Sequence, residues 1–92
     1  MDVAVIGATG QAGSAMVAVL EQRGFPLERL RVLASARSAG GTIEFRGERL
    51  VVEDASTADY RGLGIVLMAA GKGTALAHAI EHEAAVVLAH EL

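Results

Sequence analysis

The chain has 92 residues, of which 52% are hydrophobic and only 3% aromatic, and its net charge is -3 at pH 7. This length allows one small domain, and the weakly acidic balance argues against a nucleic-acid partner. The absence of cysteine excludes disulfides, zinc–thiolate sites and cysteine nucleophiles. No uncharged apolar run reaches the roughly 18 residues of a membrane-spanning helix, and no signal peptide is visible, so we expect a cytoplasmic protein without a membrane partner.

The first thirteen residues predict a buried strand that leads directly into a glycine loop. Residues 1–6 are mostly apolar, and Gly7, Gly10 and Gly13 follow at three-residue spacing. Gly7 and Gly10 allow close approaches that a Cβ would obstruct, and Gly13 would let the next helix lie close to the strand. The start of that helix suits a phosphate, because its N–H groups are free and its dipole is positive there. The spacing is a variant of the dinucleotide fingerprint, although plain strand–helix turns also contain glycines.

The next elements predict one β-α-β unit followed by a hairpin. A helix is expected over 11–23, stopped by Gly24 and Pro26, and a parallel strand over 30–34. Residues 35–41 form a loop, and strands at 42–45 and 50–53 flank a turn at 46–48. Residues 54–64 are turn-rich, with a possible helical turn at 57–60.

A second strand–helix–strand unit completes the chain. We expect a strand at 65–69, a glycine loop at 71–73, a helix from Thr74 to residue 83 and a last strand at 85–89. The whole pattern predicts the α/β class: one domain over residues 1–92, with a Rossmann-like, doubly wound, mostly parallel sheet in the order 3-2-1-4-5 and an added hairpin. The two glycine loops would face one crevice at the carboxyl ends of the strands, which favours a bound nucleotide.

The end of the second strand indicates which dinucleotide binds. NAD sites usually have Asp or Glu there, to bond the ribose 2′-hydroxyl. This chain has no carboxylate at that position and instead has Ser35, Arg37 and Ser38. Arg37 would pair bidentately with a 2′-phosphate, and the two serines could donate hydroxyl bonds. The pattern predicts NADP, against the alternative that Arg37 is an ordinary solvated loop arginine.

Several stretches together resemble the N-terminal part of the aspartate-semialdehyde dehydrogenase family. They are VAVIGATG at 3–10, the helix ending before Phe25 and Pro26, LASARSAG at 33–40, FRGE at 45–48, VED at 52–54 and AAG at 69–71. The resemblance covers nearly the whole chain, and SARSAG after the second strand is its most specific part. Members of the family reduce β-aspartyl phosphate with NADPH, releasing phosphate and giving aspartate semialdehyde for amino-acid biosynthesis.

The resemblance also implies the roles of individual residues. It places the pyrophosphate along residues 9–12, the 2′-phosphate on Ser35, Arg37 and Ser38, and the ribose and nicotinamide beside Ala70 and Gly71. The expected cofactor-binding residues are therefore Gly7, Thr9, Gly10, Gln11, Ala12, Gly13, Ser35, Arg37, Ser38, Ala70 and Gly71. Two positions depart from the family pattern: Ala69 replaces a usual serine, and Gly64 a frequent aspartate.

The family's catalytic domain has no counterpart in the sequence. Past Val87 the family continues into a domain that supplies a nucleophilic cysteine, a histidine and substrate-binding arginines. Without a cysteine, thioester chemistry is impossible in this chain, so we expect an NADP-binding domain that is not catalytic alone. Its uncovered apolar face and strand edge predict a homo-oligomer or completion by a catalytic region. The alternative is a stand-alone dimerisation or interaction module with a vestigial cofactor site.

Two other motifs are rejected. Gly71-Lys72-Gly73-Thr74 resembles the end of a P-loop, but a P-loop needs Ser or Thr directly after the lysine and glycine five residues before it. His78, Glu81 and His82 match the letters H-x-x-E-H of a zinc-peptidase class. Such a site usually needs another glutamate well downstream, so we expect no metal.

Overall fold

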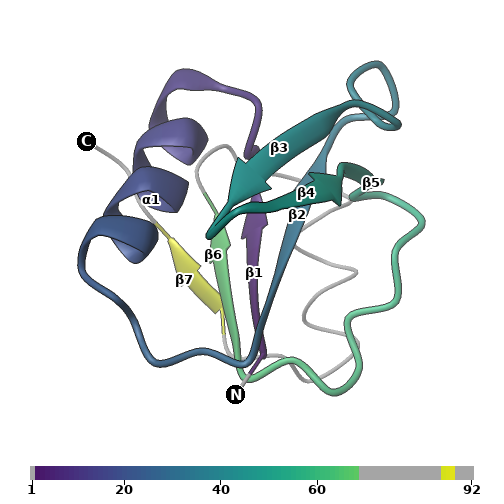
Figure 1. Ribbon diagram of the computed structural model, residues 1–92. Coiled ribbons are helices and arrows are strands. Elements are labelled where there is room, and N and C mark those ends of the chain that lie inside the picture. Colours follow the sequence, from purple (N-terminus) through teal and green to yellow (C-terminus); the bar gives the residue numbers. More distant parts are fainter. Residues whose placement is uncertain (1, 69–85, 89–92) are drawn as a thin grey trace.

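The computed structural model describes residues 2–68 and 86–88 (Figure 1). In chain order its elements are β1 (Asp2–Ile6), α1 (Gln11–Gln22), β2 (Arg29–Ala34), β3 (Thr42–Phe45), β4 (Glu48–Val51), β5 (Glu53–Asp54), β6 (Ile65–Met68) and β7 (Val86–Leu88). Within these residues five strands form a parallel sheet in the order β5-β2-β1-β6-β7, and β3 and β4 form a separate antiparallel pair. The predicted α/β class is confirmed, and the predicted strand order is confirmed in part, because the third position is occupied by β5, a strand that was not predicted. The predicted glycine loop at 71–73 and helix at 74–83 lie outside the described residues.

β1 occupies the centre of the sheet because its side chains are apolar on both faces. Val3 and Val5 pack with α1 and the β3–β4 hairpin, whereas Ala4 and Ile6 pack on the opposite face. All four are buried. A strand covered on both faces is a continuous apolar run rather than an alternating one, as this strand is. Figure 1 shows α1 and the hairpin lying over the same face of the sheet.

The opposite face is covered, in the described part of the chain, by the irregular segment 55–63. Ala55, Ala58 and Tyr60 are buried in one cluster with Ala4, Ile6, Leu33, Val66 and Met68. Tyr60 has no exposed surface, and its hydroxyl donates a hydrogen bond of 2.6 Å to the carbonyl oxygen of Ala55. This bond satisfies a polar atom that burial would otherwise leave unpaired. Within residues 2–68 and 86–88, no helix is long and apolar enough to cross a membrane.

Burial of Tyr60 predicts a loss of stability at high pH. Burial raises the pKa of Tyr60 from an ordinary value near 10 to about 12. The folded chain therefore keeps a proton that the unfolded chain releases, so stability falls between about pH 10 and pH 12, by about 2 kcal/mol in total. Tyr60 is the only tyrosine and the chain has no tryptophan, so tyrosinate absorbance reports its titration directly. In Tyr60→Phe this pH-dependent loss should disappear; an ordinary pKa in the native chain would contradict the prediction.

The end of α1 explains the position of Gly24. The helix ends at Gln22, one residue before the predicted end, and Arg23 is its C-cap. Gly24 has a φ of 58°, and the N–H groups of Gly24 and Phe25 donate to the carbonyl oxygens of Glu21 and Leu20. These two bonds form a Schellman motif, in which the left-handed position favours glycine. The predicted stop signal is confirmed.

The hairpin differs from the prediction in its turn and in its second strand. Phe45 pairs with Glu48, so the turn has two residues, Arg46 and Gly47, rather than three. Both have positive φ, 52° and 81°, as a type I′ turn requires, and this turn matches the twist of the flanking strands. Arg46 donates two hydrogen bonds of 2.6 Å to the region of α1. Its backbone N–H donates to the Glu21 carboxylate, and its guanidinium donates to the carbonyl oxygen of Phe25.

The predicted strand at 50–53 is wrong because the chain changes sheets at Val52. β4 ends at Val51, and Glu53 joins the main sheet as the first residue of β5. Val52 is buried, and its backbone bonds to Gly40 and Gly41 rather than to the hairpin. The second strand of the hairpin, β4, therefore ends at Val51, because the next residue bonds to the loop after β2.

Candidate functional site

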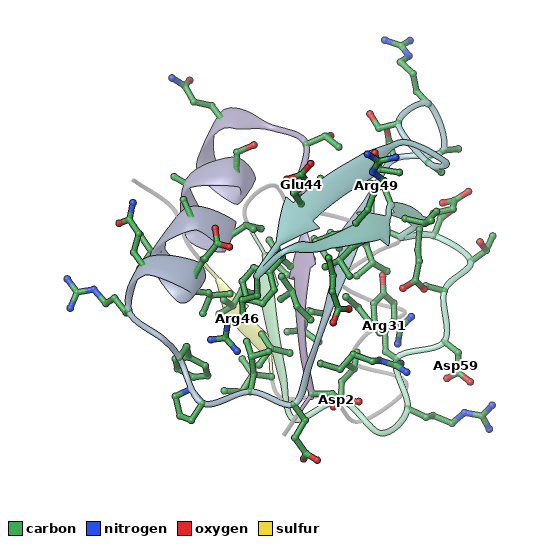
Figure 2. The ribbon with its side chains drawn as sticks, viewed as in Figure 1. Asp2, Arg31, Glu44, Arg46, Arg49 and Asp59 are labelled. Carbon is green, nitrogen blue, oxygen red and sulfur yellow. The ribbon has the colours of Figure 1, made fainter. Side chains whose placement is uncertain are left out.

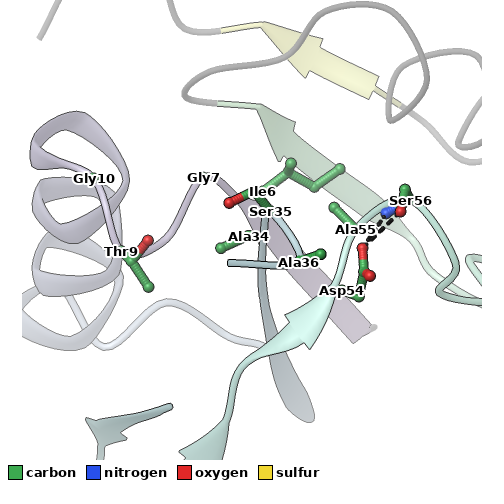
Figure 3. A pocket seen from close by; sticks show the side chains of 10 residues that line it. All are labelled: Ile6, Gly7, Thr9, Gly10, Ala34, Ser35, Ala36, Asp54, Ala55 and Ser56. Atoms are coloured by element: carbon green, nitrogen blue, oxygen red, sulfur yellow. Dashed lines mark hydrogen bonds between the residues drawn. The ribbon is translucent and has the colours of Figure 1, made fainter. Parts of the chain in front are cut away.

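A cleft of about 430 Å³ opens at the carboxyl ends of β1, β2 and β5 (Figure 3). It is lined by Ile6, Gly7, Thr9, Gly10, Ala34, Ser35, Ala36, Asp54, Ala55 and Ser56. The carboxyl ends of the strands are where open α/β sheets bind their ligands. Of the predicted cofactor residues, Gly7, Thr9, Gly10 and Ser35 therefore line one cleft.

The loop between β1 and α1 is fixed by backbone hydrogen bonds. The N–H groups of Gly7 and Ala8 donate to the carbonyl oxygen of Leu33 at 2.8 and 3.0 Å, which joins the loop to the end of β2. The N–H of Gly10 donates to the carbonyl oxygen of Gly7 at 3.0 Å. The Ser14 hydroxyl, in the first turn of α1, donates a hydrogen bond of 3.1 Å to the carbonyl oxygen of Ala8. These bonds hold the loop backbone against the end of β2 and the start of α1.

The N-terminus of α1 is open to a ligand. Gly10 is the N-cap, no side chain caps the helix, and its first turn has no acidic residue. Gln11, Ala12 and Gly13 occupy the first three helical positions, where backbone N–H groups have no partner within a helix. These free donors and the helix dipole favour an anion, as a phosphate of a dinucleotide would be.

The three glycines have three different physical reasons. The sharp turn after β1 gives Gly7 a φ of 83°, a left-handed conformation that favours glycine. At Gly13 a Cβ would lie 1.9 Å from the carbonyl oxygen of Gly7, so α1 can approach β1 only without a side chain there. Gly10 has an ordinary φ of -80°, and its Cβ would meet Gly7 at 3.4 Å, an acceptable contact. Neither φ nor packing requires glycine at position 10, where it is the N-cap of α1.

The turn after β2 adjoins the cleft. The carbonyl oxygen of Ser35 accepts hydrogen bonds from the N–H groups of Ser38 and Ala39 at 2.9 and 3.1 Å. Ser35 and Ala36 line the cleft, whereas Arg37 and Ser38 follow in the same turn without lining it. Arg37 is exposed, and it forms no hydrogen bond or ion pair with any residue in the described ranges. The structure therefore leaves the Arg37 side chain exposed, two residues after Ser35, and does not bring it into the cleft. Ala70 and Gly71 lie outside the described residues.

The third wall of the cleft, formed by Asp54, Ala55 and Ser56, was not predicted from the sequence. Oδ1 of Asp54 accepts hydrogen bonds from the Ser56 hydroxyl at 2.7 Å and from the Ser56 N–H at 3.0 Å. Both bonds lower the pKa of Asp54, and the bond from the Ser56 hydroxyl has the larger effect. The carboxyl is therefore ionised at neutral pH. The carbonyl oxygen of Asp54 accepts hydrogen bonds from the N–H groups of Thr57 and Ala58, so the turn lies at 54–58 and the helical turn expected at 57–60 is wrong. The sequence signal was Asp-x-Ser, which is typical of an Asx turn.

An ion pair between Arg31, labelled in Figure 2, and Glu53 holds this wall in register with β2. The guanidinium of Arg31 donates to both carboxylate oxygens of Glu53, at 2.8 and 2.5 Å, and to the carbonyl oxygen of Asp59 at 2.7 Å. The Arg31 side chain is only 12% exposed, and hydrogen bonding to Glu53 raises its pKa. Bidentate arginine–carboxylate pairs fix geometry as well as charge. The pair therefore positions β5, and with it Asp54 beside Ala34.

Two other hollows suit a dinucleotide less well. One of about 410 Å³ lies between α1 and β3, and the carboxylates of Glu21 and Glu44 on its walls disfavour phosphate. The other, of about 330 Å³, is formed by Ala15, Met16, Val19, Leu20 and Leu67, and no polar group lines it. We call it the apolar hollow. No cluster of metal-ligating side chains occurs among the residues that the structure describes.

A parallel sheet, a glycine loop bonded to the neighbouring strand and an open helix N-terminus beside a cleft define the class of nucleotide-binding Rossmann-like domains. Comparison with known proteins agrees: the model of the family described as "Semialdehyde dehydrogenase, NAD binding domain" matches residues 2–88. The chain belongs to this family, which confirms the resemblance and identifies the cofactor class as a nicotinamide dinucleotide.

Individual relatives agree with this assignment. An aspartate-semialdehyde dehydrogenase of Streptomyces akiyoshiensis is 49% identical over 90 residues, which are 96% of this chain and 25% of the relative. A USG-1 protein homologue of Pseudomonas aeruginosa is 44% identical over 92% of this chain and 25% of its own length. A probable aspartate-semialdehyde dehydrogenase structure from P. aeruginosa has a TM-score of 0.87 at 40% identity, over 96% of this chain and 27% of that one. The chain thus spans about a quarter of the length of these relatives.

Proposed function

We propose that residues 1–92 form one NADP(H)-binding domain. The observation that carries the proposal is the cleft at the strand ends, with the open N-terminus of α1 on one side and the turn containing Arg37 on another. The residues present fit the cofactor, because position 10 leaves space that a Cβ would fill and the end of β2 has a cation in place of a carboxylate. Bound NADPH would supply a hydride.

We assign three groups of residues to three parts of the cofactor. The pyrophosphate contacts the loop and the first turn of α1, at Gly7, Thr9, Gly10, Gln11, Ala12 and Gly13. Ser35, Arg37 and Ser38 hold the 2′-phosphate. Ala70 and Gly71 border the ribose and nicotinamide, and this assignment depends on the family resemblance alone.

The same proposal includes a role in aspartate-semialdehyde formation. The domain would hold NADPH for the reductive dephosphorylation of β-aspartyl phosphate, while the nucleophilic cysteine would come from outside these 92 residues, which contain none. A catalytic region or a second copy would cover the apolar hollow, where Val19 is 47% exposed. The cytoplasmic location and the homo-oligomer stay predictions.

Replacing Arg37 with alanine tests the choice of NADP over NAD. A charge-assisted hydrogen bond to a phosphate is lost, so the affinity for NADPH should fall about tenfold while the affinity for NADH stays unchanged. Arg49→Ala, on the hairpin and away from the cleft, is the matched control and should change neither. Calorimetric titrations with both cofactors measure this. Equal losses for NADPH and NADH would show that Arg37 does not hold the 2′-phosphate.

A second function is a stand-alone dimerisation module with a vestigial cofactor site. The apolar hollow favours it, because exposed apolar surface of this kind marks interaction sites. Sedimentation with and without NADPH separates the two functions. A chain that dimerises but does not bind NADPH at all would favour the module.

A further inference from the structure

We propose that Asp54 is a specificity residue that accepts a hydrogen bond from the exocyclic amine of adenine. The proposal rests on the proposed function, because it concerns the far end of the same cleft. Asp54 is the last residue of β5 and lines the cleft together with Ala55 and Ser56.

The position of Asp54 follows from the layout of the cleft. Figure 3 shows Thr9 and Gly10 on one side and Asp54 and Ser56 on the other, with Ala36 nearer to Asp54. A dinucleotide whose pyrophosphate lies at the N-terminus of α1 and whose ribose lies at the end of β2 extends its base toward β5. The nearby lining side chains are small and apolar, at Ala34, Ala36 and Ala55, and leave room for a flat ring.

The hydrogen bonds of Asp54 leave one oxygen for a ligand. Both bonds from Ser56 end on Oδ1, and Oδ2 has no hydrogen-bond partner among the described residues. The carboxyl is ionised, so it can only accept hydrogen bonds. Adenine presents an amine at C6, whereas hypoxanthine and guanine present an oxygen there. A carboxylate therefore favours adenine and also repels phosphate, which places the 2′-phosphate on the Arg37 side of the cleft.

Asp54→Asn changes the chemistry of this single atom. Asparagine keeps an acceptor at Oδ1 for Ser56 and replaces Oδ2 with an NH₂ donor. The donor faces the adenine amine unfavourably, but it suits the oxygen at C6 of hypoxanthine. The variant should therefore change the preference between the two bases while the turn at 54–58 remains.

The test is the ratio of affinities for NADPH and for its hypoxanthine analogue, measured by titration. The native chain should prefer NADPH about tenfold, and in Asp54→Asn this ratio should fall to about one or invert. Asp59→Asn makes the same chemical change outside the cleft and should keep the native ratio. Because each ratio compares two ligands on one variant, partial loss of folded protein cancels. Asp54→Ala, which removes both oxygens, should likewise abolish the preference.

The outcomes separate this proposal from the one it rests on. If the native chain shows no saturable NADPH binding, both are overturned. If NADPH binds but the native chain does not distinguish the two bases, or Asp54→Asn keeps the native ratio, only the role of Asp54 is overturned.

Discussion

Replacing Gly13 with alanine is expected to lower the free energy of unfolding by about 3 kcal/mol. The added Cβ would lie 1.9 Å from the carbonyl oxygen of Gly7 and 2.8 Å from the Cα of Ala8, both backbone atoms. That backbone cannot move away easily, because the N–H groups of Gly7 and Ala8 are bonded to Leu33 in the neighbouring strand. The clash must instead push α1 off the sheet and open the core around Val17 and Leu20.

Urea denaturation followed by circular dichroism measures this loss. Gly10→Ala is the matched control, since it adds the same methyl group three residues earlier, where the nearest contact is 3.4 Å. A loss below about 1 kcal/mol in Gly13→Ala would show that the helix does not need its close approach to β1.

Gly10→Ala should have the opposite profile, with small effects on stability and large effects on binding. The backbone at position 10 is extended, with a φ of -80° and a ψ of 175°, so alanine fits without strain. Alanine is a poorer N-cap than glycine, and we expect a loss of about 1 kcal/mol or less. The methyl group, however, occupies the space at the helix N-terminus, so affinity should fall at least about tenfold.

The loss in Gly10→Ala should be equal for NADPH and NADH, because both cofactors share the pyrophosphate. This distinguishes it from Arg37→Ala, which should affect NADPH alone. Calorimetric titration of both variants with both cofactors gives the comparison. Unchanged affinities in Gly10→Ala would show that no ligand approaches the helix N-terminus closely.

The sequence predicted the elements whose signals are local. The apolar run of β1 and the stop at Gly24 each depend on a few neighbouring residues, and both are confirmed. The glycine spacing predicted the close approach at Gly13, because that packing requirement is encoded in one residue. Local sequence therefore predicted the part of the site that one strand, one loop and one helix build.

The parts that sequence reasoning missed depend on contacts between distant segments. Glu53 was assigned to the hairpin because its neighbours alternate, but β5 forms through pairing with β2, where Arg31 binds the Glu53 carboxylate. Tyr60 lies in a polar, turn-rich stretch, yet it is buried against the sheet in one cluster with Leu33 and Met68, which are distant in the sequence. Asp54 lines the cleft through the same long-range pairing. The local Asp-x-Ser pattern indicates its turn but does not place that turn beside β2.

We propose above that this chain binds NADP(H) in the cleft beside α1. Calorimetric titration of the native chain with NADPH and with NADH tests it most directly. We expect one saturable site per chain, with NADPH bound about tenfold or more tightly than NADH. Absence of saturable binding, or equal affinity for the two cofactors, would contradict it.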